Sequence, residues 1–561
     1  MSQSPTVEPL ERTSSSSRCV RDLALLIGLT LALHLPFIGQ AFHLDDDQYL
    51  DIARNVYRNA LFPLELPVAF EGLHYNLWGH SHPPLNSYLI AALLLFHHRS
   101  PSEIFLHTSF LFFPLLVTVA FYFLSMRFVR SPLLASTLLA TNPTLMISAH
   151  TLMADVPLLA FWLASTVLFL RGIDRNKALL LYAAGLSLTA ACFYAYQGLA
   201  LIPLLAFYAL SRKRMHKHEI ATLCIPILLM AGWQFSGYLH RGITYVSTMF
   251  GYLGVRGYWQ GSAKIRTTVA TLTYLGGTIL PFPFIWARTS RVWNGLFTAI
   301  GLAAAFWVVH ARFADYTWLE QSLFVACFGG GVTAFLWVVS GGLRSWSIKN
   351  WAADNVFLCV WFAGMLLACV LAFYSGSARY LLPACPPLLL FLIRSDEERI
   401  GTLKRARLFY AALIGVQLVL GFFMAESDYE FARMGRLEAQ YFQERYLSQQ
   451  QPFLVSGEWG FRYYLTAIGG ETLAQDTTAS PGELIVKSRL CLGLPFDDEF
   501  SRRLEQLEQR TYRIRSPIRL LDEHSRAGFW SDGWGVLPFS FSREKFDDLY
   551  IYRVRETAIT K

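Results

Sequence analysis

Long apolar blocks alternate with short polar segments over most of the chain. A helix that crosses a bilayer needs about 20 mostly apolar residues. Blocks that meet or approach this length are interpreted as about thirteen membrane-spanning helices, at residues 22–42, 104–126, 132–149, 156–170, 178–193, 198–210, 219–238, 267–287, 293–309, 321–340, 353–374, 380–393 and 408–424. Residues 85–96 are apolar too, but this stretch is too short to span, so we expect an interfacial or half-inserted helix there.

The pattern changes near residue 425, where hydrophobicity drops and charged residues become frequent. Strand-like runs at 452–457, 482–488 and 547–554 alternate with a helix-like run at 501–513, which predicts a small α/β domain over residues 425–561. Residues 22–424 then form the transmembrane domain, with 43–103 as its first outer loop, and residues 1–21 form a polar leader. We expect Cys491, the lone cysteine of the C-terminal part, to be packed inside that domain.

Composition and charge support a membrane protein. Charged residues make up 16% of the chain and hydrophobic residues 54%, whereas about a quarter of a soluble domain is charged. The net charge of +8 has a topological explanation, because most basic residues fall on alternate loops if the N-terminus is cytoplasmic. No nucleic-acid partner is indicated. This orientation places residues 43–103, Asp155, Arg379 and the C-terminal domain outside the cytoplasm.

The apolar blocks contain almost no ionisable residues, and this absence bears on function. Ion-coupled transporters and pumps keep ionisable side chains near the bilayer midplane, where the coupled ion must bind. Here the polar chemistry is concentrated in the outer loops instead. This distribution is typical of a membrane-embedded enzyme that works at the outer interface.

The first outer loop begins with HLDDDQYLDIARNVYRN, residues 43–59. Apolar positions at Tyr49, Ile52, Ala53 and Val56 predict an amphipathic helix directly after three consecutive aspartates. One aspartate could simply cap this helix. Three adjacent carboxylates exceed what a cap can use, however, and their mutual repulsion raises the pKa of at least one.

Further polar residues lie on the same side of the membrane. GHSHPPLNSYLIAALLLF (79–96) leads into the short interfacial helix, and its loop contains His43, His74, His80 and His82. A metal site is one reading of these histidines, but their spacing does not favour joint ligation, and proton transfer is the alternative. Asp155 precedes a proline and a span, so it could be a helix cap; Arg379 could be an interfacial anchor or a phosphate ligand.

These segments resemble motifs of the dolichyl-phosphate-mannose protein O-mannosyltransferase superfamily, which includes the bacterial aminoarabinose lipid A transferases. HLDDDQYLDIAR is similar to its Asp-Glu-x-x-Tyr motif and HPPLNSYLIAALLLF to its (His/Lys)-Pro-Pro-Leu segment. MADVPLLAFWL resembles its second-loop Asp motif, and ARYLLPACPPLLL its Arg-Tyr-x-x-Pro segment. The resemblance implies a glycosyltransferase of the GT-C fold that takes a sugar from a polyprenyl-phosphate carrier outside the cytoplasm. The short loops and compact tail look bacterial, which implies an inner-membrane protein with a periplasmic active site.

The resemblance also implies roles for individual residues. Asp45 matches the first-loop catalytic Asp, Asp46 stands where the family usually has Glu, and Asp155 matches the second-loop acid. Substrate-binding roles are implied for four other residues, of which His82 replaces a common lysine: Tyr49, His82, Arg379 and Tyr380. Because Asp47 adds a third carboxylate, the choice of base among residues 45–47 stays open.

The chemistry expected of such a site is simple. A carboxylate, here Asp45, removes the acceptor proton while Arg379, with or without a divalent cation, offsets charge on the departing phosphate. A single displacement of this kind inverts the anomeric carbon. The partners would be a polyprenyl-phosphate sugar, the bilayer, and a lipid, glycan or protein acceptor. The alternatives are an oligosaccharide ligase with the same fold, a lipid or glycan flippase, and a non-catalytic scaffold of the cell envelope.

Overall fold

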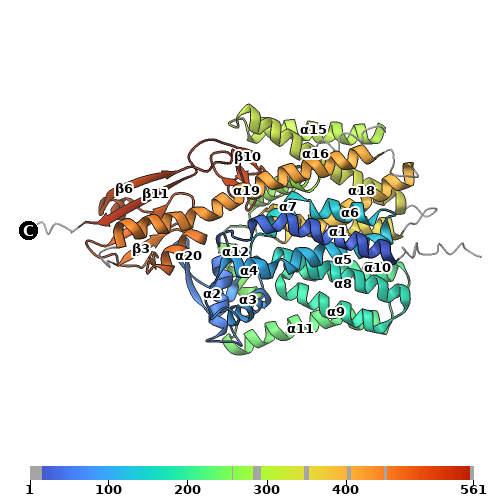
Figure 1. The fold of residues 1–561 in the computed structure, drawn as a ribbon, viewed down its shortest axis with the longest axis horizontal. Helices are drawn as coiled ribbons and strands as arrows, with labels where there is room; N and C mark the ends of the chain where they lie inside the picture. The colour runs from blue at the N-terminus through green and yellow to red at the C-terminus, as the bar shows by residue number, and fades with distance from the viewer. Residues whose placement is uncertain are drawn as a thin grey trace, which may run out of the picture.

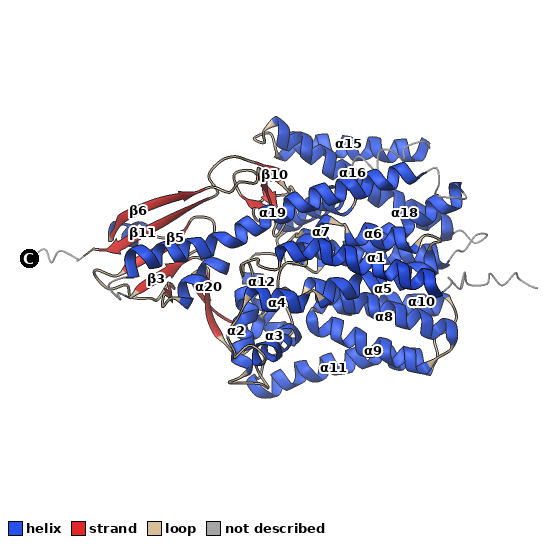
Figure 2. Cartoon of the chain, in the orientation of Figure 1, coloured by secondary structure: helices blue, strands red, loops and turns tan. Residues whose placement is uncertain are grey.

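The computed structural model describes residues 16–255, 257–281, 292–346, 353–373, 375–400, 406–447 and 452–555. The expected leader before residue 16 and the end of the expected span 267–287 lie outside this range. The protein is mostly helical, and its strands gather at one end of a helical bundle (Figures 1 and 2). The sequence-based prediction of a helical membrane protein with a C-terminal domain that contains strands is confirmed.

Eight helical segments among the described residues are long and apolar enough to cross a membrane: Ser17–Phe37, Glu103–Phe128, Asp155–Arg175, Lys217–Arg241, Gly295–Arg312, Trp318–Ser345, Ala353–Leu371 and Arg407–Tyr446. They contain α1 (Ser16–His34), α4 (Glu103–Phe110), α5 (Phe112–Phe128), α8 (Asp155–Arg175), α11 (Lys217–Arg241), α15 (Val292–Arg312), α16 (Trp318–Trp346), α17 (Ala353–Leu371) and α19 (Arg407–Tyr446).

Five of the thirteen expected spans are shorter or broken helices: α6 (Pro132–Ala140) with α7 (Pro143–Ser148), α9 (Ala178–Tyr194), η3 (Tyr196–Ala200) with α10 (Leu201–Ser211), α13 (Gly261–Tyr274) with η4 (Leu275–Ile279), and η5 (Ala378–Ala384) with α18 (Cys385–Ile400). The break in the first pair has a local cause. Asn142 precedes a proline, and its side chain accepts hydrogen bonds from the backbone N–H groups of Thr144 and Leu145, which begins a new helix.

The first outer loop forms a compact layer at the end of the bundle nearest the strands (Figure 1). It contains α2 (Asp46–Val56), the hairpin β1 (Pro67–Phe70) and β2 (Leu73–Asn76), η2 (Leu77–Gly79) and α3 (Leu85–Leu95). The predicted amphipathic helix is α2, which buries Tyr49, Ile52 and Ala53. The predicted short apolar helix is α3; its 11 residues span about 16 Å at 1.5 Å per residue, which is half the thickness of a hydrocarbon core.

α19 is 40 residues long and continues without interruption through residue 425. At 1.5 Å per residue it extends about 60 Å, twice the hydrocarbon thickness, so its second half reaches the C-terminal domain (Figure 1). There it packs with α20 (Trp459–Ala467). The division that we expect at residue 425 therefore falls inside one helix.

The C-terminal domain is built on a mixed five-stranded sheet in the order β4-β3-β5-β11-β6. β3 (Phe453–Ser456) pairs in parallel with β4 (Glu471–Thr472) and β5 (Leu484–Ser488), and β11 (Asp547–Val554) pairs antiparallel with β5 and β6 (Leu504–Tyr512). Smaller elements complete it: α21 (Asp498–Arg502), β7 (Ile518–Arg519), β8 (Leu521–Asp522), β9 (Ala527–Gly528) and β10 (Ser540–Phe541). Cys491 is buried in this domain, as predicted.

The prediction of a helix over residues 501–513 is wrong. Most of this segment is the edge strand β6, which pairs with β11 from Leu504 to Tyr512. Its charged and amide side chains have good helix propensity, but they also suit an edge strand that faces water. Pairing with a distant strand outweighs the local preference.

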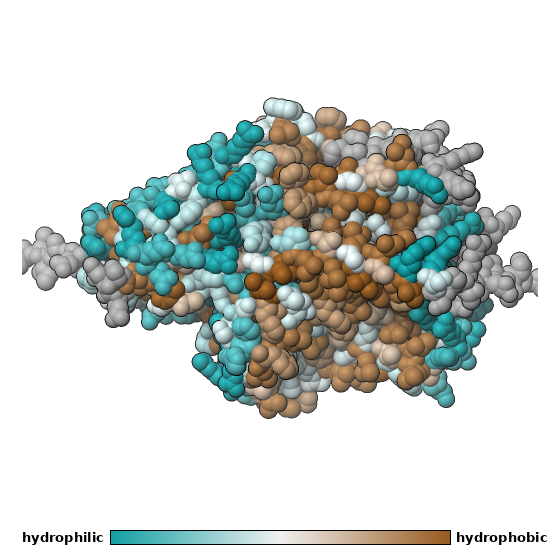
Figure 3. Space-filling model, viewed as in Figure 1, coloured by the Kyte–Doolittle hydropathy of each residue, from teal (hydrophilic) through white to brown (hydrophobic). Residues whose placement is uncertain are grey.

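The surface in Figure 3 shows a broad apolar band over the helical bundle, with hydrophilic residues towards the strand end and at the opposite end. Large apolar side chains are exposed on the helices of the bundle, among them Leu228 and Leu239 on α11, Trp307 on α15 and Leu408 on α19. An exposed apolar belt on this scale is the surface that a bilayer covers. The protein is an integral membrane protein.

Candidate active site

Arg379 is the centre of the polar site. It lies in η5, buried, with its guanidinium between two carboxylates that come from different loops. Its Nη2 is 3.5 Å from Asp45 Oδ2, and its Nη1 is 3.6 Å from Asp155 Oδ2. Nη2 also donates a hydrogen bond to the hydroxyl of Tyr380 at 3.3 Å, and Nη1 contacts the sulfur of Met153. Four of the residues expected at the site therefore meet.

The two carboxylates differ in accessibility. The side chain of Asp45 is 30% exposed, whereas that of Asp155 is 4% exposed. Asp45 occupies the N-cap position of α2, yet its side chain makes no capping hydrogen bond. Capping therefore does not explain this residue, and its carboxylate is turned towards Arg379 instead.

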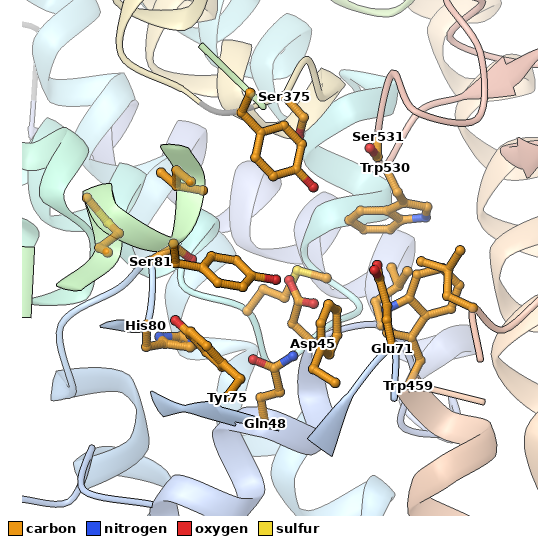
Figure 4. Close-up of a pocket in the computed structure, with 18 of the residues that line it drawn as sticks. Asp45, Gln48, Glu71, Tyr75, His80, Ser81, Ser375, Trp459, Trp530 and Ser531 are labelled. Atoms are coloured by element: carbon orange, nitrogen blue, oxygen red, sulfur yellow. The ribbon is translucent and has the colours of Figure 1, made fainter. Parts of the chain in front are cut away.

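Asp45 and Arg379 line a cavity of about 180 Å³, which we call the chamber. The first loop, α12 (Tyr245–Val255), η5 and the C-terminal domain all contribute to it. Figure 4 shows Asp45 in the middle of the view, with Tyr75, His80 and Ser81 on one side and Glu71, Trp459 and Trp530 on the other. The chamber is thus closed by elements far apart in the chain.

A second, apolar cavity of about 360 Å³ adjoins the chamber and shares Ser81, Met249 and Leu253 with it. This apolar groove lies among η3, α12 and α17, and its other walls include Leu199, Phe250, Met365, Ala368 and Phe373. His82 and Tyr380 also line it. The polar chamber therefore continues into an apolar groove beside α17, one of the helices long and apolar enough to cross a membrane.

Tyr49 and His82 lie close together within the first outer loop, with ring centroids 6.1 Å apart. Burial and the carboxylates of Asp155 and Asp45 raise the pKa of Tyr49 well above its ordinary value, so the phenol is neutral. Burial, His80 and Arg379 lower the pKa of His82 well below its ordinary value. His82 is therefore a neutral imidazole, and its Nδ1 has no hydrogen-bond partner among the described residues.

Asp46 faces away from Arg379. Its Oδ1 accepts a hydrogen bond from the backbone N–H of Leu152 at 2.8 Å, and its Oδ2 accepts one from the backbone N–H of His43 at 3.2 Å. It is fully buried. Asp46 therefore links the first outer loop to the second at Leu152, three residues before Asp155. It does not contact Arg379 as Asp45 and Asp155 do.

The sequence did not indicate the residues that pack on Arg379 from the C-terminal part of the chain. Trp530 lies over the guanidinium of Arg379 at 5.7 Å, and its indole N–H donates to Asp428 on α19 at 2.8 Å. Asp428 also pairs with His43 at 3.0 Å. Burial opposes the charge of His43, but the carboxylates of Asp428 and Asp46 overcome this and raise its pKa to about 10. No spacing in the sequence indicates that residues 43, 428 and 530 meet.

A second missed cluster joins the C-terminal domain to the first loop. Arg462 of α20 is buried between Asp47, at 2.5 Å, and Glu458, at 3.4 Å. Glu458 also accepts a hydrogen bond from the backbone N–H of Glu71 in the β1–β2 turn, at 2.6 Å. The segment GEWGFRYYL, at residues 457–465, carries this cluster and stands out in the sequence, but its partners on the first loop lie 387 and 415 residues away.

Comparison with known proteins bears on this geometry. Residues 81–234 match the family model described as dolichyl-phosphate-mannose-protein mannosyltransferase. This segment of the chain is similar to that glycosyltransferase family. The match runs from the turn before α3 to α11 and includes His82 and Asp155, so the resemblance drawn from the sequence motifs is confirmed. A search of curated protein sequences gives no match.

Solved structures of similar shape are all distant. The Archaeoglobus fulgidus oligosaccharyltransferase tethered to an acceptor peptide is 11% identical, with a TM-score of 0.47 over 82% of this chain. ArnT from Cupriavidus metallidurans bound to undecaprenyl phosphate is 15% identical, with a TM-score of 0.40 over 85% of this chain and 94% of its own. The Pmt1-Pmt2 complex of S. cerevisiae bound to its sugar donor is 15% identical, with a TM-score of 0.32 over 42% of this chain and 35% of its own. This chain spans 64% of the length of the archaeal enzyme.

A divalent cation was one expectation for the site. Within the described ranges, no group of three or more His, Cys, Asp or Glu side chains is arranged to hold a metal ion. At the centre of the candidate site, Asp45 and Asp155 are both directed at the guanidinium of Arg379. The guanidinium of Arg379 therefore already supplies a positive charge beside Asp45 and Asp155. A requirement for a divalent cation stays a prediction.

Proposed function

We propose that this protein is a membrane glycosyltransferase that moves a sugar from a polyprenyl-phosphate carrier to an acceptor hydroxyl. The observation that carries the proposal is Arg379, which is held between Asp45 and Asp155 where a polar chamber meets an apolar groove. The family description names a dolichyl-phosphate sugar as donor, and such a molecule has the matching division into sugar, phosphate and apolar chain. The active site would face the periplasm of a bacterial inner membrane.

The donor would lie across the junction of the two cavities. Its apolar chain fits the groove between η3, α12 and α17, and its phosphate comes within reach of Arg379 and the hydroxyl of Tyr380. Neutral His82 lines the groove beside Tyr380, and its imidazole supplies a second, uncharged hydrogen-bond donor for the phosphate. The chamber volume of about 180 Å³ is below the 300–1,000 Å³ of pockets for drug-sized ligands. It supports transfer of a single sugar in preference to a whole glycan.

Asp45 is the base in this mechanism, because of the three candidate acids Asp45, Asp46 and Asp155 it is the one that lines the chamber. When the donor phosphate pairs with Arg379, the carboxylate of Asp45 becomes available to accept the proton of the acceptor hydroxyl. The acceptor oxygen then bonds to the anomeric carbon while the bond from that carbon to the phosphate oxygen breaks. The polyprenyl phosphate leaves as an anion that Arg379 stabilises, and the anomeric configuration inverts. Asp155 is a positioning residue for Arg379, and Asp46 for the loop that carries Asp155.

The test uses the full-length protein in lipid nanodiscs with the polyprenyl-linked sugar that copurifies with it, identified by mass spectrometry. Asp45→Asn should lower kcat by about 10²–10⁴-fold, the usual contribution of a positioned base. Asp315→Asn is the matched control, since the side chain of Asp315 is 61% exposed and paired with Arg526 away from the chamber. Unchanged turnover in both Asp45→Asn and Asp155→Asn would overturn the assignment. A copurifying diphosphate-linked oligosaccharide would favour a glycan ligase.

A further inference from the structure

The side of the chamber formed by the C-terminal domain is aromatic and has no role in the steps above. Trp459 begins α20, Trp530 covers Arg379, and Trp534 follows in the same loop. The rings of Trp459 and Trp534 have centroids 6.2 Å apart. Trp459 is largely buried, whereas Trp534 and Ser531 are partly exposed. These three tryptophans and Ser531 are called the tryptophan wall below.

The tryptophan wall is held rigidly against the membrane domain. The backbone N–H of Ala378, next to Arg379, donates to the carbonyl of Phe529 at 2.9 Å, and the N–H of Asp532 donates to the carbonyl of Gly376 at 2.8 Å. The hydroxyl of Tyr274 donates to the carbonyls of Gly528 and Gly535, at 2.6 and 3.0 Å. A loop anchored on both sides in this way presents its side chains in one arrangement, which lowers the entropy lost on binding.

Backbone strain is concentrated at the same chamber. Among the described residues, eight non-glycine residues have positive φ angles, and Leu44, Glu71 and Trp459 are three of them, at +50°, +52° and +63°. All three line the chamber. A left-handed conformation is costly for residues with a Cβ atom and persists where the surroundings hold it, often at binding sites. Here the left-handed conformation occurs in the first loop, at Leu44 and Glu71, and in the C-terminal domain, at Trp459. These two parts of the chain lie on either side of the position that an acceptor would take.

Polar side chains complete the surroundings of the tryptophan wall. Glu71 and Gln48 come from the first loop and line the chamber beside Asp45. Figure 4 shows Glu71, Trp459 and Trp530 on the side of Asp45 opposite His80 and Ser81. The apolar groove joins the chamber at Ser81, so the tryptophan wall faces the reacting centre from the opposite direction.

We infer that the tryptophan wall binds the acceptor and that the acceptor is a carbohydrate. This inference rests on the proposed function. A pyranose ring has an apolar face of axial C–H groups, which suits a flat indole, and a rim of hydroxyls, which needs acceptors and donors such as Glu71, Gln48 and Ser531. Trp534 carries the ring at the mouth of the chamber, and one hydroxyl of that ring then points to Asp45. An uncharged Ser/Thr peptide has no ring with one apolar face and hydroxyl groups around its edge.

The experiment measures binding without turnover. Full-length protein in nanodiscs is titrated with N-acetylchitobiose, maltose and mannobiose, and separately with an uncharged Ser/Thr heptapeptide, by saturation-transfer NMR. At least one disaccharide should bind, and Trp534→Ala should weaken that binding by about tenfold, with Trp534→Phe retaining part of it. Trp307→Ala is the matched control, because Trp307 is 72% exposed on the apolar surface of α15. The Trp307→Ala protein should bind the disaccharide as tightly as the unaltered protein does.

Three outcomes would overturn the inference. No disaccharide binds, or Trp534→Ala does not change the affinity for the disaccharide that binds. The third is that the peptide binds instead and Trp534→Ala abolishes this binding. The titration is repeated with Asp45→Asn protein. Disaccharide binding there is expected to persist, since it needs no proton transfer. Failure of acceptor recognition is therefore distinguishable from failure of the proposed transfer reaction.

Discussion

The three consecutive aspartates at residues 45–47 meet three different partners. Asp45 faces Arg379, Asp46 accepts backbone N–H groups from two loops, and Asp47 pairs with Arg462 of the C-terminal domain. They stand where α2 begins, and successive helical side chains point about 100° apart because a turn holds 3.6 residues. Adjacent acids are thereby directed to the chamber, to the core of the first loop and to the C-terminal domain. The sequence predicts that one of them is catalytic, but it leaves open which one.

Asp46→Asn tests this division at the residue scale. The substitution turns an amide N–H₂ towards one of the backbone N–H groups of His43 and Leu152, so a buried donor loses its acceptor. We expect a loss of stability of about 1–3 kcal/mol and a lower kcat, because the loop with Asp155 shifts. The pH profile of kcat should keep its shape, since the base is intact. Melting temperature and pH-rate profile would be measured together; complete inactivity with an unchanged melting temperature would contradict the positioning role.

At the scale of elements, α20 is one of the contacts between the C-terminal domain and the first outer loop. Its Arg462 lies between Asp47 of α2 and Glu458, and Glu458 holds the turn of the β1–β2 hairpin. Gly460 at the start of α20 lies so close to the carbonyl of Phe42 that a Cβ atom would come within 2.3 Å. Close packing and a buried ion pair together place Trp459 at the chamber. The position of α20 therefore links the fold of the C-terminal domain to the geometry of the site.

This contact should depend on pH. Burial raises the pKa of Glu458 from 4.5 to about 8 and that of Asp47 from 3.8 to about 7, although Arg462 opposes both shifts. The folded protein therefore binds more protons than the unfolded chain over this range, so stability is full at low pH and falls as pH rises towards 8. Hydrogen exchange of β1, β2 and α20 should be faster near pH 8.5 than near pH 6 after correction for intrinsic rates. Glu458→Gln should reduce this difference; an equal difference in the variant would contradict the assignment.

At the scale of the whole molecule, polar clusters stand at the two ends of the apolar bundle. At the end opposite the chamber, Asp354 pairs with Arg212 at 2.5 Å and with Arg394 at 3.8 Å, at the ends of α17, α10 and α18. Most basic loop residues fall at this end, so the positive-inside rule predicts that it is cytoplasmic. The chamber, the tryptophan wall and the sheet occupy the other end (Figure 1).

Cysteine labelling in intact cells tests this orientation. Ser480 and Lys213 are exposed at opposite ends of the molecule, and each would be replaced by cysteine in protein that lacks the partly exposed Cys19 and Cys224. Ser480→Cys should react with a membrane-impermeant maleimide in intact cells. Lys213→Cys should react only after permeabilisation. The reverse pattern would place the chamber in the cytoplasm and remove the basis for a lipid-linked donor on the outer side.

The sequence by itself determined the features that depend on local pattern. Runs of apolar residues specify helices in a bilayer because each backbone group must find its hydrogen bond within the segment, and the short acidic and prolyl motifs indicated the glycosyltransferase family. Only the tertiary structure decided which residues meet. It separated Asp45 from Asp46, turned residues 504–512 into a strand, and brought Asp428, Arg462 and Trp530 to a site made largely by the first loop. Such contacts join residues hundreds of positions apart, and no periodicity in the chain encodes them, because they arise from the packing of α19 and the C-terminal domain onto the outer loops.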